Sequence, residues 1–201
     1  RFVLGEWAAA EGLVYDFFGP ELVQPVPESL DGPWYISCDY GTVNPTSMGL
    51  WGQKGGVWYR TAEFYYDSRK TGRQQTDGEY ADDLARLAGG RDIRGVVLDP
   101  SAASFREELI RRGWTVYRAE NEVLSGIRRT AELLRAGQLV VCAPCGDAIR
   151  EFGLYRWDTA ATGDRVVKEH DHAMDDIRYF AVTVAGRRSE GFFAGAVERS
   201  G

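Results

Sequence analysis

The sequence predicts an α/β domain built on a mixed β-sheet, and two observations lead to this fold class. Three β-rich runs follow one another from Trp34 through short connections that contain glycine, which is typical of antiparallel strands. Helical and β-rich segments then alternate, which is typical of strands joined by crossover helices. Antiparallel strands followed by parallel strands make a mixed sheet that helices cover.

The predicted strands are short and mostly end at glycine, proline or acidic residues. The first three form hairpins, the second and third being joined by the "KGG" turn, and "RGVVLDP" reads as a short buried strand because it is β-branched. "WTVYRA" and "LVV" complete the set. The predicted strands are 34–41, 46–53, 56–66, 94–100, 114–119 and 139–141.

The predicted helices follow from apolar spacing and glycine caps. Tyr80, Leu84 and Leu87 share one helical face, and Gly113 is placed to end the helix that follows "LDPSA". A third, amphipathic helix also closes on glycine, and two further helices complete the chain. The predicted helices are 77–88, 103–113, 122–138, 146–157 and 171–186.

Composition is that of an ordinary globular domain. The 201 residues suffice for one domain with a core, and the contents of 44% hydrophobic and 27% charged residues are typical. We expect no membrane association and no signal peptide, because the apolar runs are short and no charged-then-apolar leader opens the chain. The net charge of −6 argues against nucleic-acid binding by bulk charge, but it permits a local basic groove and suits carboxylates that need cations.

The first 33 residues differ from the rest. They hold four of the seven prolines and begin without methionine. We expect residues 1–33 to be a linker-like arm from a missing upstream domain, residues 34–187 to form the α/β domain, and residues 188–201 to form a tail.

The "CAPC" stretch has the C-x-x-C spacing of redox and zinc sites. Zinc requires a second cysteine pair or nearby histidines, and neither accompanies Cys142 and Cys145. The favoured interpretation is a strand end followed by a loop, with Cys38 as the third cysteine.

Acidic residues stand at unusual places in the predicted elements. Asp39 ends the first strand, Asp99 ends the strand after the first helix, and Asp175 and Asp176 follow His172 in the last helix. If the first and fourth strands are parallel neighbours, Asp39 and Asp99 emerge side by side, where ligands bind in such sheets. Close carboxylates need cations between them, and oxygen ligands suit Mg²⁺ or Mn²⁺. Two such ions about 4 Å apart hydrolyse phosphodiesters.

Each acid alone also has an ordinary explanation. An Asp before Pro, as at Asp99, is a common turn or helix cap, and Asp175 alone is usually a solvated helix residue. The residues by themselves therefore leave a metal site and a set of structural acids both open.

Five motifs resemble, in order and with similar spacing, a known family. They are "CDYGTVNPTSMGLW", "EFYYDSRKTGRQQTDGEYADDL", "VVLDPSAASFREELIRRG", "NEVLSGIRRTAELLRAGQL" and "VKEHDHAMDDIRYF". From about Trp34 to Ala185 they resemble the nuclease domain of the large terminase subunit of tailed bacteriophages, and the opening arm resembles the link from the ATPase domain of that subunit. The resemblance implies a ribonuclease H-like fold and a metal-dependent endonuclease that cuts concatemeric viral DNA during packaging, with two Mg²⁺ or Mn²⁺ ions.

The resemblance also implies the site residues. Asp39, Asp99 and Asp175 match the acids of the family, His172 lies near the metals, and Lys168 is placed to orient water or balance charge. Asp176 departs from the motif, since many relatives have alanine there. A helical wheel places Asp176 nearer the buried stripe than Asp175. We expect Asp175 to be the main ligand and Asp176 a supporting or alternate one.

DNA contacts are predicted from basic residues on loops and helix starts, although each is also compatible with a solvated face. The candidates are Arg69, Lys70, Arg73, Arg128 and Arg129. Gly41 is expected to leave room for a DNA backbone. The implied partners are double-stranded DNA, the terminase ATPase domain, the small terminase subunit and the portal protein, and the implied location is the cytoplasm of the infected host rather than the mature virion.

Three other readings compete with a packaging nuclease. An actin-like or sugar-kinase ATPase would use a "DxGT" loop as in "DYGT", but needs a second loop and more chain. A junction-resolvase-like nuclease and a non-catalytic module that docks to the motor or portal remain open. No G-x-x-x-x-G-K-[ST] loop occurs, so no ATPase activity is expected from this chain.

Overall fold

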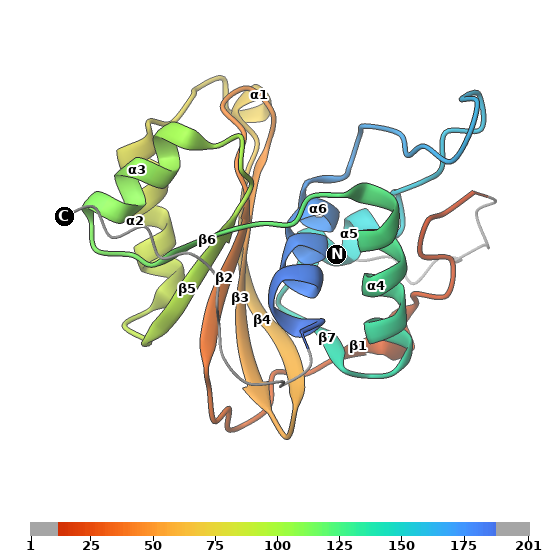
Figure 1. Cartoon of the computed structure of the whole chain (residues 1–201), viewed down its shortest axis with the longest axis horizontal. Helices are drawn as coiled ribbons and strands as arrows, with labels where there is room; N and C mark the ends of the chain where they lie inside the picture. Colours follow the sequence, from red (N-terminus) through yellow and green to blue (C-terminus); the bar gives the residue numbers. More distant parts are fainter. Residues whose placement is uncertain (1–11, 188–201) are drawn as a thin grey trace.

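The computed structural model describes residues 12–187 as a seven-stranded sheet covered by helices on both faces (Figure 1). The predicted tail at 188–201 and the first part of the predicted arm lie outside the described residues. The strands are β1 (Val23–Gln24), β2 (Trp34–Asp39), β3 (Thr46–Lys54), β4 (Val57–Tyr66), β5 (Ile93–Leu98), β6 (Val116–Arg118) and β7 (Leu139–Cys142). The helices are η1 (Pro20–Leu22), α1 (Ser68–Thr71), α2 (Asp77–Ala88), α3 (Ala103–Arg111), α4 (Val123–Arg135), α5 (Gly146–Phe152), α6 (His172–Phe180) and the π-helical η2 (Ala181–Ala185).

The sheet has the strand order β1-β7-β4-β3-β2-β5-β6. Strands β2, β3 and β4 pair in antiparallel fashion, whereas β5 joins β2 and β6 joins β5 in parallel. The prediction of a mixed sheet is therefore confirmed. Because Cys38 pairs with Leu98 across β2 and β5, the next residues, Asp39 and Asp99, leave the sheet side by side at the same edge.

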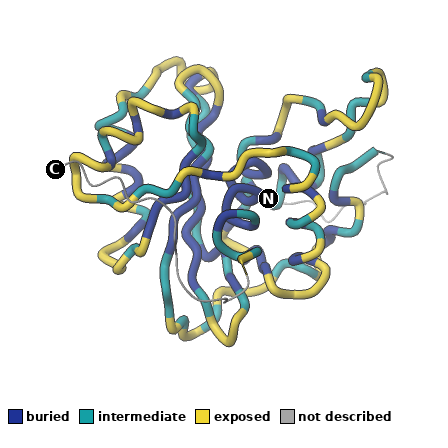
Figure 2. Tube along the Cα trace, in the orientation of Figure 1, coloured by how far each residue is buried: buried dark blue, intermediate teal, exposed yellow. Residues whose placement is uncertain are grey.

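Two apolar layers sandwich the sheet, because side chains alternate between its faces. Ile36 and Cys38 of β2 pack under α2 and α3, while Tyr35 packs on the opposite face with Phe180 and Ile177 of α6. Helices α4, α5 and α6 cover that second face (Figure 1). The central strands are the most buried part of the molecule (Figure 2). Asp39 shares the α6 face of β2, so the alternation of the strand aims it at that helix.

Most predicted elements occur where expected, and several end earlier than predicted. The helix expected at 146–157 ends at Phe152, because Gly153 caps it and Trp157 instead forms a β-bridge with Val166. The helix expected at 171–186 is α-helical to Phe180 and then widens into the π-turn of η2. No helix in the described part of the chain is both long and apolar enough to span a bilayer.

Residues 12–24, predicted as part of a linker-like arm, pack onto the domain. Tyr15 and Phe18 are buried against Phe152 in the α6-side core, with the Phe18 and Phe152 rings stacked at 3.8 Å. β1 extends the sheet by pairing in parallel with β7. The packed domain thus includes residues before Trp34, because apolar side chains in this segment supply core that the sheet needs.

Candidate functional site

A cleft of about 530 Å³ opens at the edge of the sheet where β2 ends. Asp39 reaches it from β2, Asp175 and His172 from the first turn of α6, and Arg69 and Lys70 from α1. Lys168 lines it from the segment before α6. Together with Gly41, the fold thus brings six of the predicted site residues to one cleft with Asp39.

Asp39 and His172 are in direct contact. The Nδ1 atom of His172 lies 2.9 Å from the Oδ2 atom of Asp39, and its Nε2 atom lies 3.8 Å from Asp171. Burial raises the pKa of Asp39 to about 7; the hydrogen bond to His172 opposes this shift, and the negative charge of Asp175 adds to it. Burial lowers the pKa of His172, but the contact with Asp39 outweighs burial and leaves that pKa raised. The pKa values of Asp39 and His172 are therefore both raised in this part of the cleft.

Asp175 faces cations from two sides. Its Oδ1 atom accepts a hydrogen bond of 2.9 Å from the buried Arg178, and the ammonium of Lys168 lies 3.9 Å from its Oδ2 atom. Lys168 also lies 3.7 Å from Asp171, whose pKa is raised by burial and by the charge of Asp175. Lys168 is 64% exposed, so its ammonium offsets part of the charge of these two carboxylates while it remains in contact with solvent.

Asp99 stands next to Asp39 on the neighbouring strand but is held outside the cleft lining. Its Oδ1 atom accepts from the amide of Ser101 at 2.6 Å, and its Oδ2 atom accepts from the hydroxyl of Tyr179 at 2.7 Å. Burial raises the pKa of Asp99, but the side chain and amide of Ser101, together with the Tyr179 hydroxyl, outweigh burial and leave that pKa lowered. Asp99 is therefore ionised and firmly oriented.

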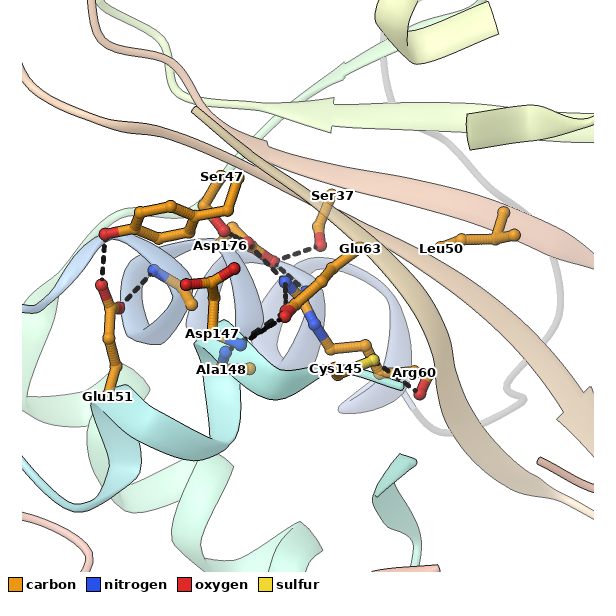
Figure 3. Close-up of polar contacts among 12 residues, drawn as sticks. Ser37, Ser47, Leu50, Arg60, Glu63, Cys145, Asp147, Ala148, Glu151 and Asp176 are labelled. Atoms are coloured by element: carbon orange, nitrogen blue, oxygen red, sulfur yellow. Dashed lines mark hydrogen bonds and ion pairs between the residues drawn. The ribbon is translucent and has the colours of Figure 1, made fainter. Parts of the chain in front are cut away.

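Asp176 points away from the cleft. It is fully buried, and its two oxygens accept from Arg60 at 2.5 and 3.0 Å, from Ser37 at 2.7 Å and from Ser47 (Figure 3). The helical wheel was right that Asp176 is the more buried of the pair. The expectation of an alternate metal ligand does not fit this placement, because Asp176 would first have to release a buried guanidinium.

The predicted DNA-binding residues divide into two groups. Arg69 and Lys70 line the cleft from α1, which occupies the predicted loop. Arg73 is instead paired with Glu79 at the start of α2. The two arginines of α4 lie apart from the cleft lining: Arg128 is exposed, and Arg129 binds the carbonyl of Gly186 and the side chain of Glu132.

Gly41 lines the cleft, but its missing side chain has a local cause. A Cβ atom there would lie 2.5 Å from the carbonyl oxygen of Asn44 and 2.8 Å from that of Pro45. The loop after β2 therefore closes only over a glycine, and the suggested clearance for DNA remains a prediction.

Two arginines were not identified from the sequence, Arg150 in the cleft and the buried Arg60. Arg150 lines the cleft, with its guanidinium 5.4 Å from the Tyr65 ring. Arg60 lies in β4 on the same face as the buried Trp58, and a charged residue at an inward position signals a buried acidic partner. The inward position of Arg60 therefore indicates a buried acidic partner, but the sequence does not show which residue that partner is.

The chemistry of the donors fits a hard divalent cation. Asp39 and Asp175 offer carboxylate oxygens to one cleft. Burial first, and the charge of Asp175 second, raise the pKa of Asp39, and a bound cation would stabilise its ionised form. Within the described residues, no group of three or more His, Cys, Asp or Glu side chains is drawn together as a ready ligand cage. The side chains instead satisfy one another in pairs, as the contact between Asp39 and His172 illustrates.

Known structures resemble this chain closely. The large terminase of the thermophilic bacteriophage D6E, in complex with ADP, is 43% identical with a TM-score of 0.83, over 92% of this chain and 48% of that protein. The P22 large terminase nuclease domain is 18% identical with a TM-score of 0.70, over 88% and 94% of the two chains. The large terminase nuclease of phage G20c with bound magnesium is 16% identical with a TM-score of 0.64, over 86% and 97%.

The matches cover different shares of the known structures. Neither a protein-family model nor a curated protein sequence matches it. The chain spans about half the length of the D6E protein, but nearly the whole of the P22 and G20c nuclease domains, whose fold it shares. The chain belongs to the large terminase family, and its fold is that of the nuclease domains solved for P22 and G20c.

Proposed function

We propose that this domain is a metal-dependent endonuclease that cuts double-stranded viral DNA during genome packaging. The observation that carries the proposal is the meeting of Asp39 and Asp175, from β2 and α6, in one cleft with the cations Arg69 and Lys70. Carboxylates suit Mg²⁺ or Mn²⁺, and nearby cations suit DNA phosphates. The magnesium bound by the G20c nuclease and the cobalt bound in another structure of that protein support divalent-metal use.

Asp39 and Asp175 are the proposed metal-holding residues, with Asp99 contributing from the neighbouring strand. Two ions, when bound, would activate water and stabilise the leaving oxygen of the phosphodiester. His172 orients Asp39 through its Nδ1 atom, and Lys168 offsets charge between Asp171 and Asp175. Arg69 and Lys70 hold the DNA backbone beside the ions.

The wider setting follows from the family. We propose that the domain works with the terminase ATPase domain, the small terminase subunit and the portal protein in the host cytoplasm, and that it is absent from the mature virion. We also propose that the chain alone does not hydrolyse ATP, since it lacks a phosphate-binding loop of the G-x-x-x-x-G-K-[ST] type. ATP turnover by the purified chain would contradict this last point.

Plasmid cleavage tests the nuclease directly. The wild-type protein is expected to nick and cut plasmid DNA with Mn²⁺ or Mg²⁺ and to stop when a chelator is added. Asp39→Ala, Asp99→Ala and Asp175→Ala should each lower the rate by more than about 100-fold, beyond the usual effect of residues that only support a ligand. A basic surface control, Arg86→Ala, should cleave at the wild-type rate.

Three outcomes would contradict the proposal in different ways. Full cleavage by Asp39→Ala would favour a non-catalytic docking module. Cleavage confined to four-way junctions would favour a resolvase-like nuclease. Wild-type activity in chelator would remove the metal from the mechanism.

A further inference from the structure

A buried polar network connects β4 with α6 below the cleft. Arg60 is fully enclosed and donates to both oxygens of Asp176, and its Nη2 atom lies 3.3 Å from Glu63. Ser37 of β2 and Ser47 of β3 complete the shell around Asp176 (Figure 3). Three adjacent strands thus hold one side chain of α6.

A second branch of the network fixes the start of the same helix. Tyr65 of β4 donates to Glu151 of α5 at 2.5 Å, and Glu151 accepts from the backbone amide of Ala173 at 2.7 Å. Glu63 meanwhile accepts from the amide of Asp147 at 2.6 Å, which ties α5 to β4 (Figure 3). The bonds therefore close a loop through β4, α5 and the first turn of α6.

The geometry of an α-helix links this network to the cleft. Successive residues are about 100° apart, so fixing the direction of Asp176 also fixes the direction of Asp175. His172 precedes Asp176 by four residues and lies on nearly the same face, one turn closer to the helix start. A helix rotated by a few tens of degrees would move both His172 and Asp175 relative to Asp39.

Strand β3 leaves space for the side chain of Arg60. A Cβ atom on Gly49 would lie 1.7 Å from the Nη1 atom of Arg60, so the bare glycine of β3 makes room for the guanidinium. Buried ion pairs add little net stability compared with apolar packing, although their directional bonds restrict geometry. Orientation is therefore the effect to expect from such a network.

We propose that Asp176, held by Arg60, Ser37 and Ser47, is a positioning residue that sets the rotation of α6, so that Asp175 and His172 meet Asp39 in the cleft. Asp176 does not bind the ion itself. The expected effect on the metal site rests on the proposed nuclease function. The orientation of α6 rests on the contacts of Asp176.

The test compares Asp176→Asn and Ser47→Ala with the control Thr130→Ala. Thr130 is equally buried, but its hydroxyl donates to the Gly126 carbonyl within α4, outside the network. Three quantities are measured: the Mn²⁺ concentration for half-maximal plasmid cleavage, the rise in melting temperature caused by Mn²⁺, and hydrogen exchange across 172–176 in metal-free protein.

Asp176→Asn is expected to need about 10-fold more Mn²⁺, to lose most of the metal-induced rise in melting temperature, and to exchange faster across 172–176. Ser47→Ala should shift all three in the same direction by less. Thr130→Ala should lower the melting temperature in the absence of metal, yet respond to Mn²⁺ as the wild type does.

A purely structural role would lower stability in both network variants while leaving the response to Mn²⁺ and the exchange of 172–176 at wild-type values, and that result overturns the inference. If Asp176→Asn does not fold, Ser47→Ala decides. If the wild type neither cleaves nor responds to Mn²⁺, the nuclease proposal fails, and the exchange measurement alone decides whether the network orients α6.

Discussion

At the scale of single residues, neighbouring acids have opposite surroundings. Asp175 borders the cleft beside Lys168, whereas Asp176 is enclosed by Arg60 and two serines. Helical spacing predicted which of the two is more buried, because periodicity determines direction around a helix axis. It did not predict Arg60 as the partner, because that contact joins positions 116 residues apart and leaves no local pattern.

The three cysteines offer a prediction at the same scale. All are buried and unpaired, and burial raises the pKa of the Cys142 thiol to about 11 and that of the Cys145 thiol to about 12. Since the thiolate is the reactive form, these side chains should be inert in the folded protein at neutral pH. Cys142 ends β7 as expected, and Cys145 lies directly before α5. The absence of a redox or zinc role stays a prediction.

Thiol labelling measures this directly. A chromogenic disulfide reagent should modify fewer than one thiol per folded chain within minutes, and all three after the protein is unfolded in guanidinium chloride. Rapid labelling of Cys142 or Cys145 in the native protein would show an accessible, activated C-x-x-C site.

At the scale of secondary-structure elements, the sequence predicted most strands and helices because each has a clear local signal. The helix Asp77–Ala88 begins at a capping box made by Thr76 and Glu79 and ends before the left-handed Gly89. The helix over 146–157 was predicted too long, because the β-bridge between Trp157 and Val166 is a contact between segments. Local propensity does not reveal such pairing.

The close approach of β3 to Arg60 gives a prediction about an element. Gly49→Ala should push the guanidinium away from Asp176 and destabilise the fold by about 3 kcal/mol or more, the usual cost of breaking a buried ion pair. Urea unfolding followed by circular dichroism measures the change. Gly146→Ala is the matched control, since no atom lies within 4 Å of its added methyl group, and its stability should stay near that of the wild type.

At the scale of the whole molecule, the fold was predictable and its outer boundary was not. The arrangement of strands β2 to β6 follows from the order of hairpins and crossovers along the chain. It places Asp39 and Asp99 at one edge of the sheet, as expected. Residues 12–24 were assigned to an arm because the first 33 residues hold four of the seven prolines and begin without methionine, yet Tyr15 and Phe18 fill the core next to Phe152. The link from this arm to an ATPase domain remains a prediction.

Overall charge leads to a prediction about DNA affinity. The chain carries a net charge of −6. The basic residues at the cleft are accompanied there by several carboxylates. The isolated domain should therefore bind duplex DNA weakly, with a Kd above about 1 µM at physiological salt, as for non-specific binding. Fluorescence anisotropy with labelled duplex in Ca²⁺ measures this without relying on cleavage. A nanomolar Kd would mean that a further basic surface contributes.

The fit of Arg60 beneath Gly49 also limits how this protein can diverge. An apolar residue in place of Asp176 would leave a buried guanidinium without its main partner, so Arg60 would have to change as well. Once Arg60 is gone, position 49 no longer has to be glycine. Positions 49, 60 and 176 should therefore covary among related chains: glycine, arginine and aspartate inherited together, or all three replaced.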